Sequence, residues 1–243
     1  TWLAADAGHR KQVEEDGELS VAVAARIARE YSIARTIGEV QLGDDEAVGK
    51  GLPLLVEDLN DARADWRRLS LSEGARTCEE LARKHRDRAS GEWVTQPVSA
   101  VTKLMWFLEP SGWTMYDSLA QSGLAGASSA SDFYGELERL GFQAKAKELG
   151  CLSRARGFEI FGERIIDKFL MLRGSHWKIS AKRRKSDGES YLAQAVDRNR
   201  FFVAALPDQG AAITALADEI AALLPDSAFA TKRSDKMLSR YPF

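Results

Sequence analysis

Two residues of the types that carry out covalent chemistry, Lys103 and Asp117, lie 14 positions apart in the most aromatic part of the chain. An unprotonated lysine amine can attack an electrophilic carbon, displace a leaving group and remain bound as an imine. An aspartate carboxylate beside the same carbon can stabilise the positive charge that develops there. A cleft that holds both side chains would therefore suit displacement of a leaving group from a carbon on which positive charge develops.

The element that must position Lys103 is a short apolar helix. Its predicted buried face consists of four residues at helical spacing, namely Val101, Leu104, Met105 and Leu108. Pro110 is expected to end this helix, because proline lacks an N–H and disfavours the α conformation in the residue before it. Gly112 then permits a tight turn.

The element that must position Asp117 is a second helix, which begins after the turn. Asp117 and Ser118 are both of the types that cap helix N-termini. We therefore expect Lys103 and Asp117 to face one cleft. Three aromatic side chains are expected to line this cleft and to bind the substrate: Trp106, Trp113 and Tyr116.

The order of these residues resembles that of a known family. Residues 101–124, VTKLMWFLEPSGWTMYDSLAQSGL, fit the pattern T/S-K-x-x-x-F-x-x-P-x-x-W/F-x-x-Y/W-D-S, which is similar to that of the helix-hairpin-helix DNA glycosylases, specifically the 8-oxoguanine glycosylase-like branch. Residues 163–169, ERIIDKF, resemble the family more weakly. The hairpin of the family usually reads Leu-Pro-Gly-x-Gly before the lysine, whereas residues 96–102 read QPVSAVT and contain neither glycine.

The resemblance implies an all-α, two-lobed bundle like that of the helix-hairpin-helix glycosylases. The implied activity is excision of a damaged or modified purine such as 8-oxoguanine from duplex DNA, with or without AP-lyase activity. Lys103 would be the nucleophile at C1′ and Asp117 its electrostatic partner. The base would have to leave the duplex, and aromatic faces offset part of the unstacking cost. No cofactor and no metal are expected.

A basic stretch in the second half of the chain is the expected contact with DNA phosphates. Residues 151–200 hold twelve Lys and Arg against six Asp and Glu, although the whole chain has a net charge of −2. Seven residues are the DNA-binding candidates: Arg173, His176, Lys178, Lys182, Arg183, Arg184 and Lys185. Residues 1–50 hold ten acidic side chains against six basic ones, so this region is the expected surface for a protein partner.

Each of these assignments has a plainer alternative. A lysine near the start of an apolar helix usually faces solvent, and an aspartate that opens a helix is usually only a cap. The aromatic side chains can be core residues, and residues 182–185 can be an exposed loop. Two other functions therefore stay open. One is a binding module that keeps the glycosylase scaffold without chemistry, in a defence or genome-maintenance assembly. The other is a helical interaction protein unrelated to nucleic acid.

Length and composition indicate a globular protein in which no membrane span is expected. The 243 residues are 44% hydrophobic and 29% charged, and no apolar run approaches the roughly 18 residues of a membrane span. The first residues show no signal-peptide pattern. Cys78 and Cys151 lack metal-ligand spacing and are expected to be reduced thiols of a cytoplasmic protein.

Helical periodicity and sparse strand signals predict an all-α chain of about eight helices. We assign no element to residues 1–16. Besides the two helices described above, we expect helices at 18–40, from Pro53 to 69, from a Ser70–Glu73 capping box to 88, at 132–149, at 157–173, at 191–206 and at 211–224. Residues 1–90 are expected to form an N-terminal helical region, and residues 91–243 the glycosylase-like core with the C-terminal helices. The sequence leaves open whether residues 1–90 form a separate domain or pack onto the rest as part of the same domain.

Glycine and serine residues set the expected ends of two of these helices. Ser131 should cap the helix at 132–149, which Gly141 weakens in its middle and Gly150 ends. Gly174 should break the helix at 157–173.

Overall fold

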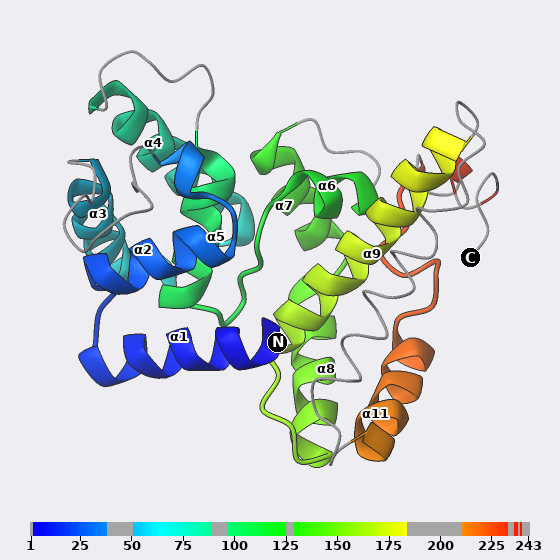
Figure 1. Ribbon diagram of the computed structural model, residues 1–243. Helices are drawn as coiled ribbons and strands as arrows, with labels where there is room; N and C mark the ends of the chain where they lie inside the picture. The colour runs from blue at the N-terminus through cyan, green and yellow to red at the C-terminus, as the bar shows by residue number, and fades with distance from the viewer. Residues whose placement is uncertain are drawn as a thin grey trace. The chain divides into compact units, whose positions relative to one another are not determined.

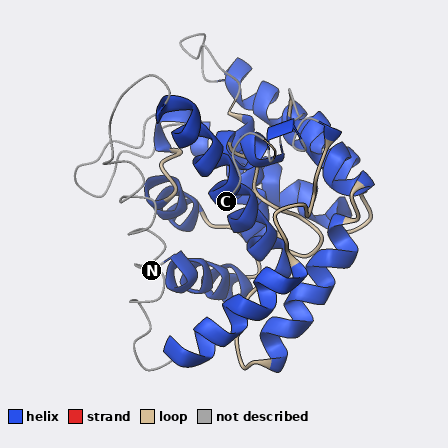
Figure 2. Ribbon diagram, turned by 90° about the vertical axis from the view of Figure 1, so that its right-hand side faces the viewer, coloured by secondary structure: helices blue, strands red, loops and turns tan. Residues whose placement is uncertain are grey.

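The computed structural model describes residues 2–37, 51–88, 97–124, 129–183, 210–232, 236–237 and 239. These residues form ten α-helices and one 3-10 helix, and they contain no strand (Figures 1 and 2). The predicted all-α class is therefore confirmed. No helix in this described part of the chain is long and apolar enough to cross a membrane.

The chain divides into two compact units, Trp2–Tyr116 and Asp117–Phe243. The division differs from the one expected after residue 90. The physical reason is that the apolar helix α5 (Val98–Leu108) packs against all four preceding α-helices and so belongs to the core of the N-terminal unit. Lys103 therefore lies in the N-terminal unit, whereas Asp117 is the first residue of the C-terminal unit.

The N-terminal unit is built around α5 (Figure 1). The surrounding elements are α1 (Trp2–Asp16), α2 (Val21–Glu30), the 3-10 helix at Ala34–Thr36, α3 (Gly51–Trp66) and α4 (Leu71–Arg88). The predicted helix at 18–40 is thus shorter, because the chain turns at Ser32, a non-glycine residue with φ +56°. The sequence pattern predicts no element for residues 1–16, yet Trp2–Asp16 form α1.

A reciprocal pair of hydrogen bonds starts α4, as the sequence predicts. The backbone N–H of Ser70 donates to the Glu73 carboxylate at 2.8 Å, and the backbone N–H of Glu73 donates to the Ser70 hydroxyl at 3.2 Å. The capping box satisfies two amide groups that a helix end would otherwise leave without partners. These hydrogen bonds lower the pKa of the Glu73 carboxyl, because they favour its charged form.

The C-terminal unit is organised by α9 (Gly162–Arg183), which packs against α6 and α8 (Figure 1). Its other helices are α6 (Ser118–Leu124), α7 (Ala130–Arg139), α8 (Phe142–Ala155) and α11 (Gly210–Leu223). The helix expected at 211–224 is confirmed as α11. The helix expected at 191–206 lies outside the described residues.

The helix predicted at 132–149 is two helices. Gly141 has φ +77°, in the left-handed region that suits glycine, and separates α7 from α8. Ser129, two residues before the predicted cap Ser131, accepts the N–H of Asp132 and caps α7. Gly150 does not end a helix, since α8 continues through it to Ala155.

Glycine residues at two helix crossings in the C-terminal unit allow backbones to touch. A Cβ on Gly174 would lie 2.0 Å from the carbonyl oxygen of Leu119, and a Cβ on Gly162 would lie 1.8 Å from that of Ala146. Neither position therefore has room for a side chain. The prediction that Gly174 breaks a helix is wrong: α9 runs through this residue, which is needed for the close approach of α6.

Candidate functional site

The two predicted catalytic residues lie at element positions that the sequence anticipated. Lys103 is the sixth residue of α5, and this helix stops before Pro110 as predicted. From Ala100 to Pro110, every residue except Lys103 is buried. Within the described part of the chain, the Lys103 ammonium makes no hydrogen bond and no ion pair. From Ala100 onward, helix α5 therefore carries one partly exposed amine among buried residues.

The C-terminal end of α5 is fixed by two cations of the N-terminal unit. A guanidinium nitrogen of Arg10 donates to the backbone carbonyl of Phe107 at 2.6 Å. Arg67 donates to the carboxylate of Glu109, which is 3% exposed, at 2.9 Å. Positive charge at a helix C-terminus complements the helix dipole. These contacts hold the helix that carries Lys103 in one place within its unit.

Thr102 ties the segment after the turn back to the helical turn that carries Lys103. The indole N–H of Trp113 donates to the Thr102 carbonyl at 3.2 Å, and the backbone N–H of Tyr116 donates to the Thr102 hydroxyl at 3.3 Å. Sequence reasoning missed this residue. The signal that could have pointed to Thr102 is the start of the pattern T/S-K, in which Thr or Ser directly precedes the lysine that matches Lys103.

Asp117 is an N-cap, as its residue type predicted. One carboxylate oxygen, Oδ1, accepts the backbone N–H groups of Leu119 and Ala120, both at 2.8 Å. The other oxygen, Oδ2, makes no hydrogen bond or ion pair within the described residues. The side chain is partly exposed, so α6 begins with a fixed carboxylate that has one oxygen left to contact another molecule.

The three aromatic residues predicted to line a cleft differ in their exposure. Trp106 and Trp113 are 1% and 2% exposed. Trp113 packs edge-on against Trp66, with ring centroids 4.7 Å apart, and Trp106 packs edge-on against Phe107. Both indoles are thus core residues of the N-terminal unit and present no open stacking face. Only Tyr116 of the three is partly exposed.

The prediction that Arg173 contacts DNA phosphates does not agree with its burial. Arg173 is 1% exposed, and its guanidinium donates to four backbone carbonyls. It therefore has no surface to offer a phosphate. His176, Lys178, Lys182 and Arg183 belong to α9, but their side chains lie outside the described structure, as do the whole residues Arg184 and Lys185.

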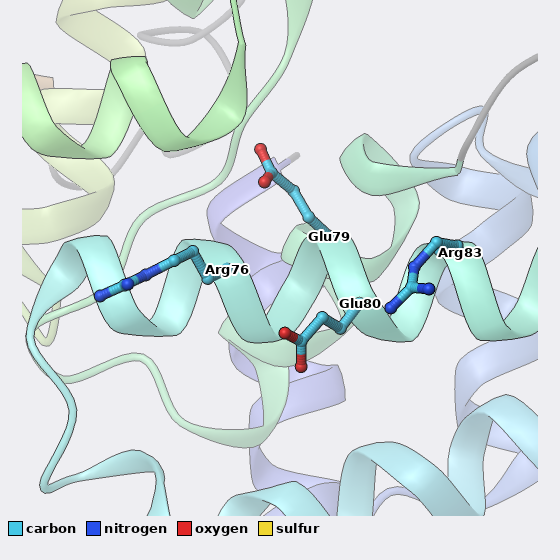
Figure 3. Close-up of a pocket in the computed structure, with 4 residues that line it drawn as sticks. All are labelled: Arg76, Glu79, Glu80 and Arg83. Atoms are coloured by element: carbon cyan, nitrogen blue, oxygen red, sulfur yellow. The ribbon is translucent and has the colours of Figure 1, made fainter.

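A shallow hollow of about 270 Å³ lies along α4. Its lining side chains project from successive turns of this one helix: Arg76, Glu79, Glu80 and Arg83 (Figure 3). Two cations and two anions give the hollow no formal net charge, so it does not favour a polyanion such as DNA.

Within the described residues, no group of three or more His, Cys, Asp and Glu side chains is placed to hold a metal ion.

Comparison of the chain with models of protein families, with curated proteins and with solved structures gives no match.

Proposed function

We propose that this chain is a DNA N-glycosylase that removes a damaged or modified purine, with Lys103 as its nucleophile and Asp117 as its electrostatic partner. The observation that carries the proposal is the exposure of Lys103 and its lack of a bonding partner in the described part of the chain. It is the one residue from Ala100 to Pro110 that is not buried, and it has no partner among the described residues.

The contrast with other lysines supports a chemical role for Lys103. Lys84 and Lys145 form ion pairs with Asp58 and Glu148, at 2.5 and 2.6 Å, as surface lysines commonly do. A lysine that sits in a row of buried residues without such a pair is held by the packing of its helix alone. Its amine is therefore available to a ligand.

The two carboxylate oxygens of Asp117 have different roles, which supports the proposal: Oδ1 caps α6, and Oδ2 is left for the substrate. The capping bonds to Leu119 and Ala120 fix the orientation of the carboxylate. A fixed carboxylate stabilises developing positive charge without having to reorganise during the reaction. In the proposed reaction, this charge is the one that develops on the deoxyribose as the base departs.

The proposed reaction accounts for every bond formed and broken without a cofactor. The lone pair of the Lys103 amine forms a bond to C1′ while the C1′–N bond to the base breaks, and the base leaves with that electron pair and takes up a proton. The C1′–O4′ bond then opens, which gives an imine between Lys103 and C1′ and a hydroxyl at C4′. Hydrolysis of the imine releases the amine.

Borohydride trapping tests this proposal. The full chain is incubated with duplex DNA that contains 8-oxoguanine, in the presence of borohydride, which reduces a lysine imine to a stable amine. We expect a covalent protein–DNA adduct with the wild type and none with Lys103→Gln. Lys84→Gln, which removes an ion-paired lysine of the same unit, is the matched control and should retain the adduct.

The outcomes separate the parts of the proposal. An adduct that persists in Lys103→Gln would assign the nucleophile to another residue. Base release without an adduct would keep the glycosylase and make Asp117 its central residue. Neither base release nor an adduct, across a panel of purine lesions, would refute the proposal.

A second candidate is a binding module that keeps this helical scaffold without chemistry. The observation that favours it is the burial of Trp106 and Trp113, which leaves no described indole face for a flipped base. This candidate predicts DNA binding in a filter or fluorescence assay that is equal for duplexes with and without a lesion, with no base release from either.

A further inference from the structure

The short helix α6 is held at both of its ends. It has seven residues, and isolated helices of this length are not stable in water. At its start, Asp117 accepts two backbone N–H groups. At its other end, Nε of Arg173 donates to the carbonyl of Gly123 at 2.6 Å, and the hydroxyl of Thr231 donates to that of Leu124 at 3.3 Å.

Arg173 joins this helix to a distant part of the chain. Its terminal nitrogens donate to the carbonyls of Asp226 (2.9 Å), Ala228 (2.6 Å) and Phe229 (3.2 Å). We call residues 226–231 the C-terminal strap. The single guanidinium therefore binds the end of α6 and the C-terminal strap at the same time.

The surroundings of Arg173 keep its guanidinium in one orientation. The cation lies over the rings of Phe169 and Trp177, 4.9 and 5.3 Å from their centroids. Burial lowers the pKa of the guanidinium to about 10, and the charge of Asp226 opposes this shift. Arg173 is thus a buried cation at neutral pH, and its positive charge complements the C-terminal end of the α6 dipole.

We infer that Arg173 is a positioning residue for Asp117: by capping α6 and binding the C-terminal strap, it fixes the helix whose first turn orients the Asp117 carboxylate. The inference rests on the proposed function, in which Asp117 lies beside the sugar. Arg173 is buried and touches no substrate. Its effect on the reaction is transmitted by α6. The backbone of α6 also contacts that of α9 at Gly174, which limits the positions that α6 can adopt.

Arg173→Lys is the test variant, because lysine keeps the charge but cannot donate to several carbonyls in the fixed fork of a guanidinium. Arg164→Lys is the matched control: Arg164 is in the same helix, is 2% exposed, and pairs with Asp167 within α9. Both variants are assayed at a temperature at which circular dichroism shows them folded.

The first readout separates catalysis from binding. We expect Arg173→Lys to lower the single-turnover rate of base release by roughly 10- to 100-fold, with an unchanged Kd for the damaged duplex. Arg164→Lys should leave the rate unchanged. An equal fall in both variants, or a change in Kd alone, would overturn the inference.

The second readout does not depend on activity. Hydrogen exchange at the amides of Leu119 and Ala120 should be faster in Arg173→Lys than in the wild type, while exchange in α8 stays the same. Equal acceleration in α6 and α8 would show a loss of global stability and would overturn the positioning role. Wild-type protein that releases no base would instead refute the proposed function, whatever the exchange data show.

Discussion

The backbone of Gly174 lies against that of Gly123: a Cβ on Gly174 would come within 2.8 Å of the Gly123 amide nitrogen and 2.0 Å of the Leu119 carbonyl oxygen. The contact joins α9 to α6, so two helices cross without any side chain between them. The close approach lets Arg173, the residue before Gly174, reach the end of α6.

Gly174→Ala should destabilise the C-terminal unit. The added methyl group would have to displace the backbone of α6, and overpacking of this kind costs about 1–3 kcal/mol or more. The free energy of unfolding in urea is the measurement. Gly8→Ala is the control, for which a change of the opposite sign in the free energy of unfolding is expected. Gly8 lies in α1, and no atom lies within 4 Å of the position its Cβ would take, so alanine should raise the free energy of unfolding by about 0.5–1 kcal/mol. Equal effects of the two variants would contradict the close approach.

The capping box at Ser70 and Glu73 should make the N-terminal unit sensitive to acid. The folded-state pKa of Glu73 lies below its unfolded value, so its contribution to stability is present above the unfolded pKa, about 4.3, and is lost as pH falls through the lower folded value. We expect the Tm difference between wild type and Glu73→Gln to be largest near pH 7 and to shrink below pH ~4. The Glu80→Gln variant of the same helix should not show this pattern; if it does, the acid sensitivity is not that of the capping box.

Two substitutions of Asp117 separate its structural role from its chemical one. Asn keeps an oxygen for the amides of Leu119 and Ala120 but removes the charge, whereas Ala removes both. Asp117→Ala should lose about 0.5–2 kcal/mol of unfolding free energy, and Asp117→Asn much less. Base release should fall in both variants. Retention of the wild-type rate in Asp117→Asn would leave Asp117 as a cap alone.

The two cysteines should differ in reactivity. Cys78 is 0% exposed, and burial raises the pKa of its thiol well above the usual range, so the reactive thiolate is suppressed. Cys151 is exposed on α8. A disulfide reagent should therefore modify one thiol of the native chain quickly and the second only after unfolding. Cys151→Ser should abolish the fast phase; a fast phase that persists would show that Cys78 is accessible.

The features that the sequence predicted well depend on neighbouring residues. The Ser70–Glu73 box, the stop before Pro110 and the cap at Asp117 all follow from residues within four positions of one another. Helix α1 did not show such a pattern. Its contacts come from distant residues, since His9 bonds Glu30 and Arg10 bonds the carbonyl of Phe107.

The features that the sequence missed are tertiary. Gly174 reads locally as a helix breaker, because nothing nearby in sequence shows that α6 will lie against it. Arg173 reads as a surface cation, because the carbonyls that accept its hydrogen bonds lie some 50 residues away in either direction. For the candidate site, the types of Lys103 and Asp117 were readable. The sequence left open whether Lys103 faces a cleft or bulk solvent, since a helix that is apolar nearly all round has no solvent side in its pattern.

The bonds of Arg173 also set an order of events during synthesis. The partners of its guanidinium in the C-terminal strap lie 53 to 56 residues after Arg173, so the ribosome adds them well after Arg173 itself. Until they emerge, the enclosed position of Arg173 would hold a charge without most of its acceptors, which opposes closure of the unit around it. Closure of the C-terminal unit around Arg173 should therefore wait until the C-terminal strap has emerged from the ribosome.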